Sequence, residues 1–291
     1  MDKVPSRGPI GPGCHGHYVC TLVGSRGNFP GANHVIDVEQ GAGIFRTRQT
    51  NTCKAADASA RRLSVYFFIV VTMRLTLATY NVHRCIGWDG QYSRERILAV
   101  LQELEADLIA LQEVDEEDTL QWLAVHLSMT AIAGPNLRRH GAYGNGVLTT
   151  CKLGELRLVD LSFRSHEPRG AIDVDVMCGR ERLQIIATHL GLRPSERRWQ
   201  VRKLLKRFGT RHCILMGDIN EWFLWGRPLR WITKIFGHTP SLRSFPSPRP
   251  IFALDRIWIR PPGSVIEIRT HKTALSSVAS DHLPVRAVIE L

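Results

Sequence analysis

The chain has 291 residues, of which 44% are hydrophobic and 22% charged, and its formal net charge is +11 at pH 7. The longest apolar run, residues 63–71, is too short for a membrane-spanning helix, which needs roughly 20 residues. The composition therefore excludes such a helix and is ordinary for a globular protein.

The excess of Lys and Arg favours polyanionic partners, namely nucleic acid, anionic lipid headgroups or phosphorylated small molecules, without choosing among them. The seven cysteines are an odd number and show no paired spacing. This pattern argues against a disulfide-stapled secreted domain and for a reducing compartment. We therefore expect a cytoplasmic protein, with peripheral attachment to an anionic membrane surface as the alternative.

Residues 1–62 are rich in Gly, Pro, Ser, Asn and Thr and show no sustained hydrophobic period. We predict that residues 1–72 are a disordered leader, or a start assigned too early, with translation beginning at Met73. Four potential ligands, Cys14, His15, His17 and Cys20, stand close together, but their spacing fits no common zinc finger. Residues 73–291 form the predicted folded domain.

Beyond Met73, short β patterns alternate with amphipathic helical patterns. Ser93 is typical of a helix N-cap, because the apolar residues Ile97, Leu101 and Leu104 follow it at helical spacing. A second helix is predicted at 195–208. Strands are predicted, in chain order, at 75–81, 107–112, 146–150, 156–161, 171–177, 183–188, 213–216, 254–259 and 285–291, with 171–177 and 183–188 as a hairpin. This alternation predicts an α/β fold of mixed sheets covered by helices.

Polar side chains follow several of these strands directly. Asn81, Glu113 and His189 each come after an apolar run, as do Asp218 and Asn220. Each alone has an ordinary interpretation as a turn, cap or solvated residue. Together they supply the carboxylate and amide oxygens that Mg²⁺ prefers, at strand ends where rigid scaffolds usually present functional groups.

Seven segments in chain order closely resemble the successive motifs of the endonuclease/exonuclease/phosphatase superfamily. The resemblance covers about residues 73–291 and implies a DNase I-like fold, a four-layer sandwich of two mixed β-sheets flanked by helices. The segments are Thr79–Val82, Leu111–Glu113, Tyr143–Gly146, Thr188–Leu190, Gly217–Asn220, Leu254–Ile257 and Ser280–Pro284.

The resemblance also implies a metal-dependent phosphoester hydrolase. Glu113 would be the main ligand of Mg²⁺, or alternatively Mn²⁺, with Asn81 beside it and Asp281 next to the metal. Asp218 and Asn220 would orient the attacking water or the phosphate.

The remaining roles follow from the same resemblance. His282 would act as general base or hold the water, with its ring oriented by Asp255. His189 would face the phosphate, Arg169 would clamp it, and Tyr143 would supply a hydrogen bond. The reaction would be an in-line attack of water on phosphorus.

The substrate is less defined than the chemistry. Thr188-His189-Leu190 resembles the branch of nucleases, lipid phosphodiesterases and phosphatases rather than the abasic-site repair branch. We therefore prefer phosphodiesters of lipid or nucleotide type, with a DNA or RNA nuclease as the alternative and an inactive binding protein third. No obligate protein partner is indicated.

Two basic stretches leave alternatives open. Residues 222–236 combine three Trp and two Phe with Arg227, Arg230 and Lys234 and contain no acid. They are either a helix with Leu229 and Ile232 packed inward, a segment at a lipid interface, or a nucleic-acid track. Residues 193–207 hold a run of cations that we interpret as a solvated helix face.

Overall fold

A computed structural model describes residues 17–22, 37–41, 44–48, 67–137, 143–209 and 212–291, with side chains described from Met73 onward. The chain divides into two compact units, and the smaller spans His17–Arg74. Within it, β1 (His17–Leu22) pairs antiparallel with the first part of β4 (Phe67–Asn81). β2 (Asp37–Gly41) and β3 (Ile44–Arg48) form a hairpin, and β3 also pairs with β4.

Within the predicted leader, the residues that the structure describes therefore belong to β1, β2, β3 and the first part of β4. The possible ligands Cys14 and His15 lie outside the described residues, as do the side chains of His17 and Cys20.

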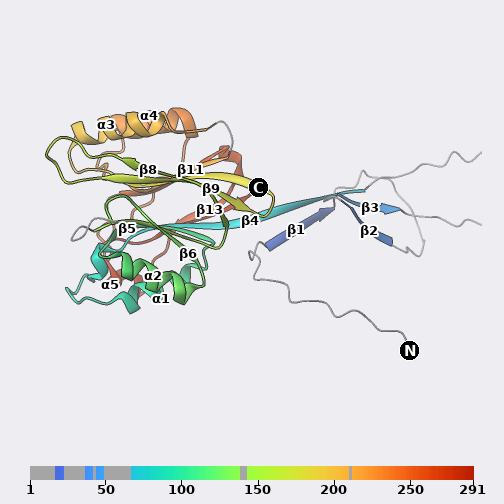
Figure 1. The fold of residues 1–291 in the computed structure, drawn as a ribbon, viewed down its shortest axis with the longest axis horizontal. Helices are drawn as coiled ribbons and strands as arrows, with labels where there is room; N and C mark the ends of the chain where they lie inside the picture. The colour runs from blue at the N-terminus through green and yellow to red at the C-terminus, as the bar shows by residue number, and fades with distance from the viewer. Residues whose placement is uncertain (1–16, 23–36, 42–43, 49–66, 138–142, 210–211) are drawn as a thin grey trace, which may run out of the picture. The chain divides into compact units, whose positions relative to one another are not determined.

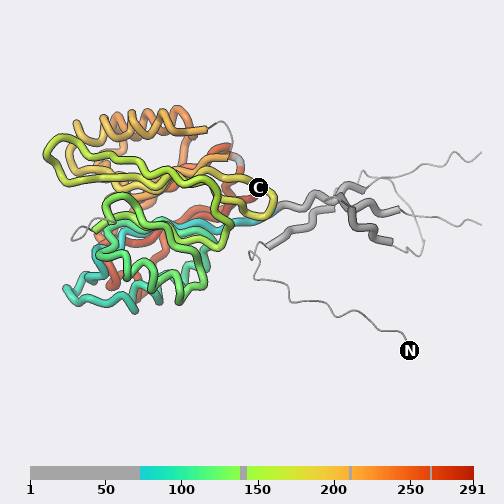
Figure 2. Tube along the Cα trace, viewed as in Figure 1, coloured from blue at the N-terminus to red at the C-terminus, as the bar shows by residue number. Residues whose placement is uncertain are grey.

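The larger unit begins with a six-stranded sheet in the order β13-β14-β4-β5-β7-β6. β4 and β5 are parallel, and β5 pairs antiparallel with β7. The chain returns at its end to the sheet in which the domain starts, as the teal and red traces in Figure 2 show. Besides β4, the strands are β5 (Leu108–Val114), β6 (Thr130–Ala133), β7 (Gly144–Thr149), β13 (Val265–Thr270) and β14 (Val285–Glu290).

The second sheet has five strands in the order β12-β11-β10-β9-β8. β10 and β11 are parallel, and β9 and β10 form the hairpin that the sequence predicted. The strands are β8 (Lys152–Asp160), β9 (Gly170–Cys178), β10 (Glu181–His189), β11 (Cys213–Asp218) and β12 (Asp255–Arg260).

Helices cover the outer face of each sheet, as Figure 1 shows. α1 (Arg94–Leu104) and α2 (Glu117–Leu127) pack on the six-stranded sheet, and α3 (Pro194–Leu205) and α4 (Arg227–Phe236) pack on the five-stranded one. Shorter helices are η1 (His83–Cys85), η2 (Pro262–Ser264) and α5 (Ser276–Ala279). The arrangement confirms the predicted four-layer α/β sandwich.

The N-terminus of α1 shows how local sequence and packing agree. The Ser93 hydroxyl accepts a hydrogen bond from the Arg96 amide, which confirms Ser93 as the N-cap. Ile97, Leu101 and Leu104 are buried against the sheet. Burying one such side chain contributes about 1.5–3 kcal/mol, so the packed face outweighs intrinsic helix propensity.

The two parallel strand pairs place their carboxyl ends together at one edge of each sheet. Asn81 stands opposite Gln112 across β4 and β5, and His189 stands opposite Asp218 across β10 and β11. Gly217, which precedes Asp218, has a φ of +141°, and a Cβ there would lie 1.8 Å from the Thr188 carbonyl oxygen. Only glycine permits this close approach of the two backbones.

Two cysteines form a disulfide that the sequence did not predict. Cys151 and Cys178 are joined with their Cα atoms 5.0 Å apart, across the hairpin of β8 and β9. An odd total of cysteines does not prevent two of them from pairing, so the sequence argument for a reducing compartment loses its basis. Among the described residues, no helix combines the length and the apolar character needed to cross a bilayer.

Candidate active site

An amide at the end of β4 joins carboxylates from two other strands. The Asn81 Nδ2 atom donates to Glu113 Oε1 and to Asp218 Oδ2, both at 3.1 Å. The Asn81 Oδ1 atom accepts from the amide of His83, so the orientation of the side-chain amide is fixed. Residues from both sheets therefore meet in one site, as the strand-end positions predicted.

His189 lies on the same side of this cluster. Its Nδ1 atom is 2.9 Å from an Arg169 guanidinium nitrogen, and its Nε2 atom is 3.4 Å from Asp218 Oδ2. The Asn220 side-chain amide also contacts Nε2, at 2.9 Å, and donates to the Leu190 carbonyl. A guanidinium and the nitrogen of a side-chain amide only donate hydrogen bonds, so both ring nitrogens of His189 face donor groups. Burial, then the charges of Arg169 and His282, hold the pKa of His189 well below its usual value, so the ring is neutral.

His282 is held by a buried carboxylate. Its Nδ1 atom lies 2.7 Å from Asp255 Oδ2, which also accepts from the Ser244 hydroxyl at 2.6 Å. Burial alone lowers the pKa of His282, but the charge and hydrogen bond of Asp255 outweigh burial and raise it to about 10. The Nε2 atom is 3.9 Å from Asp218 Oδ2 and faces the cluster. Burial, followed by the charge of Asp255, raises the pKa of Asp218.

Several site residues have a strained backbone. Glu113 and Asn220 have φ values of 54° and 52°, and the three residues of η1 also have positive φ. Such conformations cost about 1–3 kcal/mol at non-glycine residues and concentrate at functional sites. The backbone N–H of Asn220 donates to Asp218 Oδ1, and this hydrogen bond holds the turn in place. The strain therefore fixes the directions of side chains that come from different strands.

The charges at the site fit a hard cation. Glu113 and Asp218 converge on one amide, and among the described residues no Lys or Arg pairs with either carboxylate or with Asp281. The side chains of Glu113 and Asp281 are 20% and 25% exposed, so their oxygens are accessible. Oxygen ligands of this kind, with room for water, are typical of Mg²⁺ sites.

Ligand atoms of Asp218, Asp255 and His282 also lie within 4.8 Å of one another. Asp255 already accepts from Ser244 and pairs with the Nδ1 atom of His282. This group is therefore better described as an oriented histidine beside an acid, and Glu113 offers the more open ligand.

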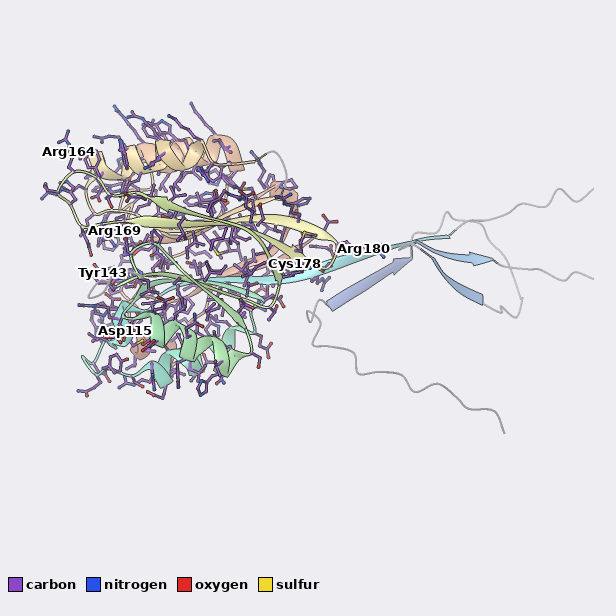
Figure 3. All side chains as sticks on the ribbon, viewed as in Figure 1. Asp115, Tyr143, Arg164, Arg169, Cys178 and Arg180 are labelled. Carbon is purple, nitrogen blue, oxygen red and sulfur yellow. A yellow bond between two sulfur atoms is a disulfide. The ribbon has the colours of Figure 1, made fainter. Side chains whose placement is uncertain are left out.

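Arg169 and Tyr143 meet at a residue that sequence reasoning did not single out. Arg169 donates to Glu167 at 2.7 Å, and the Tyr143 hydroxyl donates to the same carboxylate. Figure 3 shows Tyr143 and Arg169 at one end of the sandwich, with Cys178 at the other end. Glu167 is only two residues from Arg169 in the chain, whereas nothing in the sequence pointed to Ser244, which is far along the chain from His282.

One basic residue was assigned wrongly. Arg197 was predicted on a solvated helix face, but it is 2% exposed and hydrogen-bonded to Glu221 and to the Leu192 carbonyl. The buried carboxylate partner comes from the loop after β11, which a helical pattern does not reveal.

Comparisons with known proteins agree with this geometry. The family model described as Endonuclease/Exonuclease/phosphatase family matches residues 78–282. No curated protein sequence matches the chain.

Several solved structures share the fold. An endonuclease/exonuclease/phosphatase from Bacteroides vulgatus has 18% identity and a TM-score of 0.64, covering 75% of this chain and 99% of its own. One from Beutenbergia cavernae has 21% identity and a TM-score of 0.59, covering 75% and 72%. D. rerio TDP2, complexed with single strand DNA product, has 17% identity and a TM-score of 0.58, covering 74% and 98%.

Proposed function

The chain belongs to the endonuclease/exonuclease/phosphatase family, and on that premise we propose that it is a Mg²⁺-dependent hydrolase of phosphodiesters of lipid or nucleotide type. Members of the family are hydrolases that act on phosphoester bonds. The observation that carries the proposal is the convergence of Glu113 and Asp218 on the Asn81 amide, beside two histidines with opposite pKa shifts.

Glu113 and Asp281 would hold the cation through their carboxylate oxygens, and Asn81, whose side-chain nitrogen donates to Glu113, would lie beside it and position that carboxylate. When bound, the cation supplies positive charge that polarises a non-bridging phosphoryl oxygen and lowers the pKa of nearby water and of His282. Mn²⁺ suits the same oxygen ligands and is the alternative metal.

His282 would hold the attacking water at Nε2 and take its proton. The Asp255 carboxylate keeps Nδ1 protonated, so Nε2, which faces the cluster, is the nitrogen that loses its proton when the bound cation lowers the pKa of His282. Asp218, between the two histidines, would orient the same water. The carboxylate also stabilises the imidazolium that forms when the proton is transferred.

The opposite side of the site would stabilise charge on the phosphoryl group. Neutral His189 lies on this side, and Arg169 and Asn220 add fixed hydrogen-bond donors next to it. Glu167 holds the Arg169 guanidinium in place, and Tyr143 holds Glu167. Donors fixed before the reaction stabilise developing negative charge without reorganising.

The test is a substrate panel with the full chain, in Mg²⁺, in Mn²⁺ and in chelator. The panel contains an aryl phosphodiester, an aryl phosphomonoester, inositol phosphates, phospholipids, single-stranded and plasmid DNA, and RNA. We expect turnover of at least one phosphodiester, lost in chelator. Glu113→Ala should behave like the chelated enzyme, whereas Asp118→Ala, at an exposed carboxylate on α2, should behave like the wild type.

A DNA or RNA nuclease is the second candidate. The net charge of +11 favours a polyanionic substrate, and the similar TDP2 structure holds single strand DNA product. Turnover confined to the nucleic acids would select the nuclease. Equal activity of wild type and Glu113→Ala would reject the metal-dependent mechanism. Absence of turnover on every substrate would favour an inactive binding protein, the third alternative.

A further inference from the structure

An exposed apolar loop stands beside the active site. Trp222, Phe223, Leu224 and Trp225 follow one another between β11 and α4 and are 37%, 56%, 59% and 72% exposed. We call residues 222–225 the apolar tip. Four consecutive large apolar side chains in water are unfavourable for an isolated protein, and such patches commonly mark interaction sites.

The base of the tip is firmly anchored. Gly226 donates to the Phe223 carbonyl at 2.9 Å and closes a turn. Just before the tip, Glu221 is buried and accepts two hydrogen bonds from Arg197. The rings of Phe223 and Trp225 pack on each other, with centroids 5.2 Å apart. The tip is therefore held in a defined conformation in which Phe223, Leu224 and Trp225 are more than half exposed.

The helix that follows adds positive charge on the outer surface. α4 buries Leu229, Ile232 and Phe236 against the sheet, so its cations face solvent. Arg227, Arg230 and Lys234 line a surface groove of about 340 Å³ together with Trp231. No carboxylate among the described residues pairs with these three cations, and Arg202 on α3 lies over the Trp231 ring at 4.8 Å.

The tip is connected to the site through aromatic contacts. The Trp222 ring packs against Phe252 and Phe245, at centroid distances of 4.8 and 5.8 Å. Phe245 in turn lies 4.8 Å from the His282 ring. A surface that receives the tip would therefore lie next to the catalytic cluster.

We propose that the apolar tip and the cations of α4 dock onto the headgroup region of an anionic lipid bilayer. The tip would enter the boundary between headgroups and acyl chains, and Arg227, Arg230 and Lys234 would contact lipid phosphates. Exposed Trp, Phe and Leu beside unpaired cations are the combination that interfacial segments use. A bilayer fits better than a nucleic acid, because Leu224 has no flat face on which a base could stack. This docking goes beyond the proposed hydrolysis and does not depend on it.

Vesicle sedimentation tests the proposal. The full chain is mixed with vesicles of phosphatidylcholine alone or with phosphatidylglycerol added. We expect binding at least about tenfold tighter to the anionic vesicles, since each cation near such a surface contributes roughly 1 kcal/mol. Phe223→Ser/Leu224→Ser/Trp225→Ser should lose at least about tenfold in affinity. The matched control Val125→Ser/Leu156→Ser/Ile266→Ser removes exposed apolar side chains elsewhere and should bind like the wild type.

The contribution of charge is tested separately. Arg227→Glu/Arg230→Glu should weaken binding to the anionic vesicles by more than about tenfold. Lys152→Glu/Arg180→Glu makes the same change of net charge far from the site, where Figure 3 shows Arg180, and should weaken binding much less. Circular dichroism and thermal melting check that each variant is folded.

Three further measurements separate the outcomes. Glu113→Ala should still bind vesicles, and the tip variant should still hydrolyse whatever soluble ester the wild type does, so a failed hydrolase proposal would leave this test intact. The proposal would be overturned if the tip variant bound anionic vesicles as tightly as the wild type. It would also be overturned if the two charge-reversal variants lost the same amount of affinity for these vesicles. Weakened binding to a labelled single-stranded oligonucleotide, with vesicle binding unchanged, would assign the surface to nucleic acid instead.

Discussion

The His282 imidazole has one nitrogen fixed by Asp255 and one directed at the cluster. If Nε2 takes the proton of the attacking water, His282→Ala should lower turnover by about 10²–10⁴-fold. The measurement is the metal-dependent rate on whichever substrate the panel identifies. His238→Ala, at an exposed histidine after α4, is the matched control. Unchanged turnover in the His282 variant would remove this residue from the mechanism.

Arg197 and Glu221 form a buried ion pair at the base of the apolar tip. Arg197→Met should destabilise the fold by about 3–5 kcal/mol, because it leaves the Glu221 carboxylate buried and unpaired. The double variant Arg197→Met/Glu221→Leu should recover much of that loss. Urea unfolding measures both, with Arg198→Met on the same helix as control. Equal stability of the single and double variants would contradict this account.

Sequence reasoning found the residues that follow strands and missed those fixed by distant contacts. Asn81 and Asp218 could be found because parallel strands end at the same edge of a sheet. Ser244 and the buried state of Arg197 could not, because their partners come from other parts of the chain. The roles of the site residues remain predictions until the variants are measured.

Among the secondary-structure elements, α1 depends on its N-cap. The Ser93 hydroxyl accepts from the Arg96 amide at 3.2 Å. Ser93→Ala should therefore cost about 1 kcal/mol in the free energy of unfolding, whereas Ser93→Asp should retain most of it. Chemical denaturation measures the difference. A Ser93→Ala variant as stable as Ser93→Asp would show that the cap contributes nothing.

The hairpin of β8 and β9 depends on a second local feature, the disulfide of Cys151 and Cys178, which are 27 residues apart. Cys151→Ser/Cys178→Ser should lower the free energy of unfolding by about 2–4 kcal/mol, because the cross-link restricts the unfolded chain. Reductant should bring the wild type to the same value and leave the double variant unchanged. Equal unfolding of wild type with and without reductant would show that the two thiols do not pair.

Whether a strand or helix could be predicted from the sequence depends on how many of its residues are buried. Strands β5 and β11 are almost wholly buried, so their apolar runs were visible in the sequence. β13 alternates partly buried and exposed residues at a sheet edge, β6 has four residues, and α2 has no side-chain cap. Short or edge elements carry too little apolar signal to be found by period alone.

At the scale of the whole molecule, we propose that the catalytic domain is residues 73–291. All the proposed site residues lie between Asn81 and His282, and the family match covers residues 78–282. A chain of residues 73–291 should therefore fold cooperatively. Its turnover should stay within about twofold of that of the full chain, because no residue proposed to stabilise the transition state is removed. Thermal melting and the substrate panel check this. A fragment that is soluble but unfolded would move the boundary to the start of β4.

The parallel strand pairs give the molecule an internal repetition. β4, α1 and β5 make one strand–helix–strand unit, and β10, α3 and β11 make another, each at the centre of its own sheet. In the first unit, Asn81 ends β4 and Glu113 lies near the end of β5. In the second unit, His189 ends β10 and Asp218 ends β11. The site therefore takes residues from two units with the same strand–helix–strand order, one in each sheet. Asp255 on β12, and Asp281 and His282 from the loop before β14, complete it, so neither unit alone contains the residues proposed for catalysis.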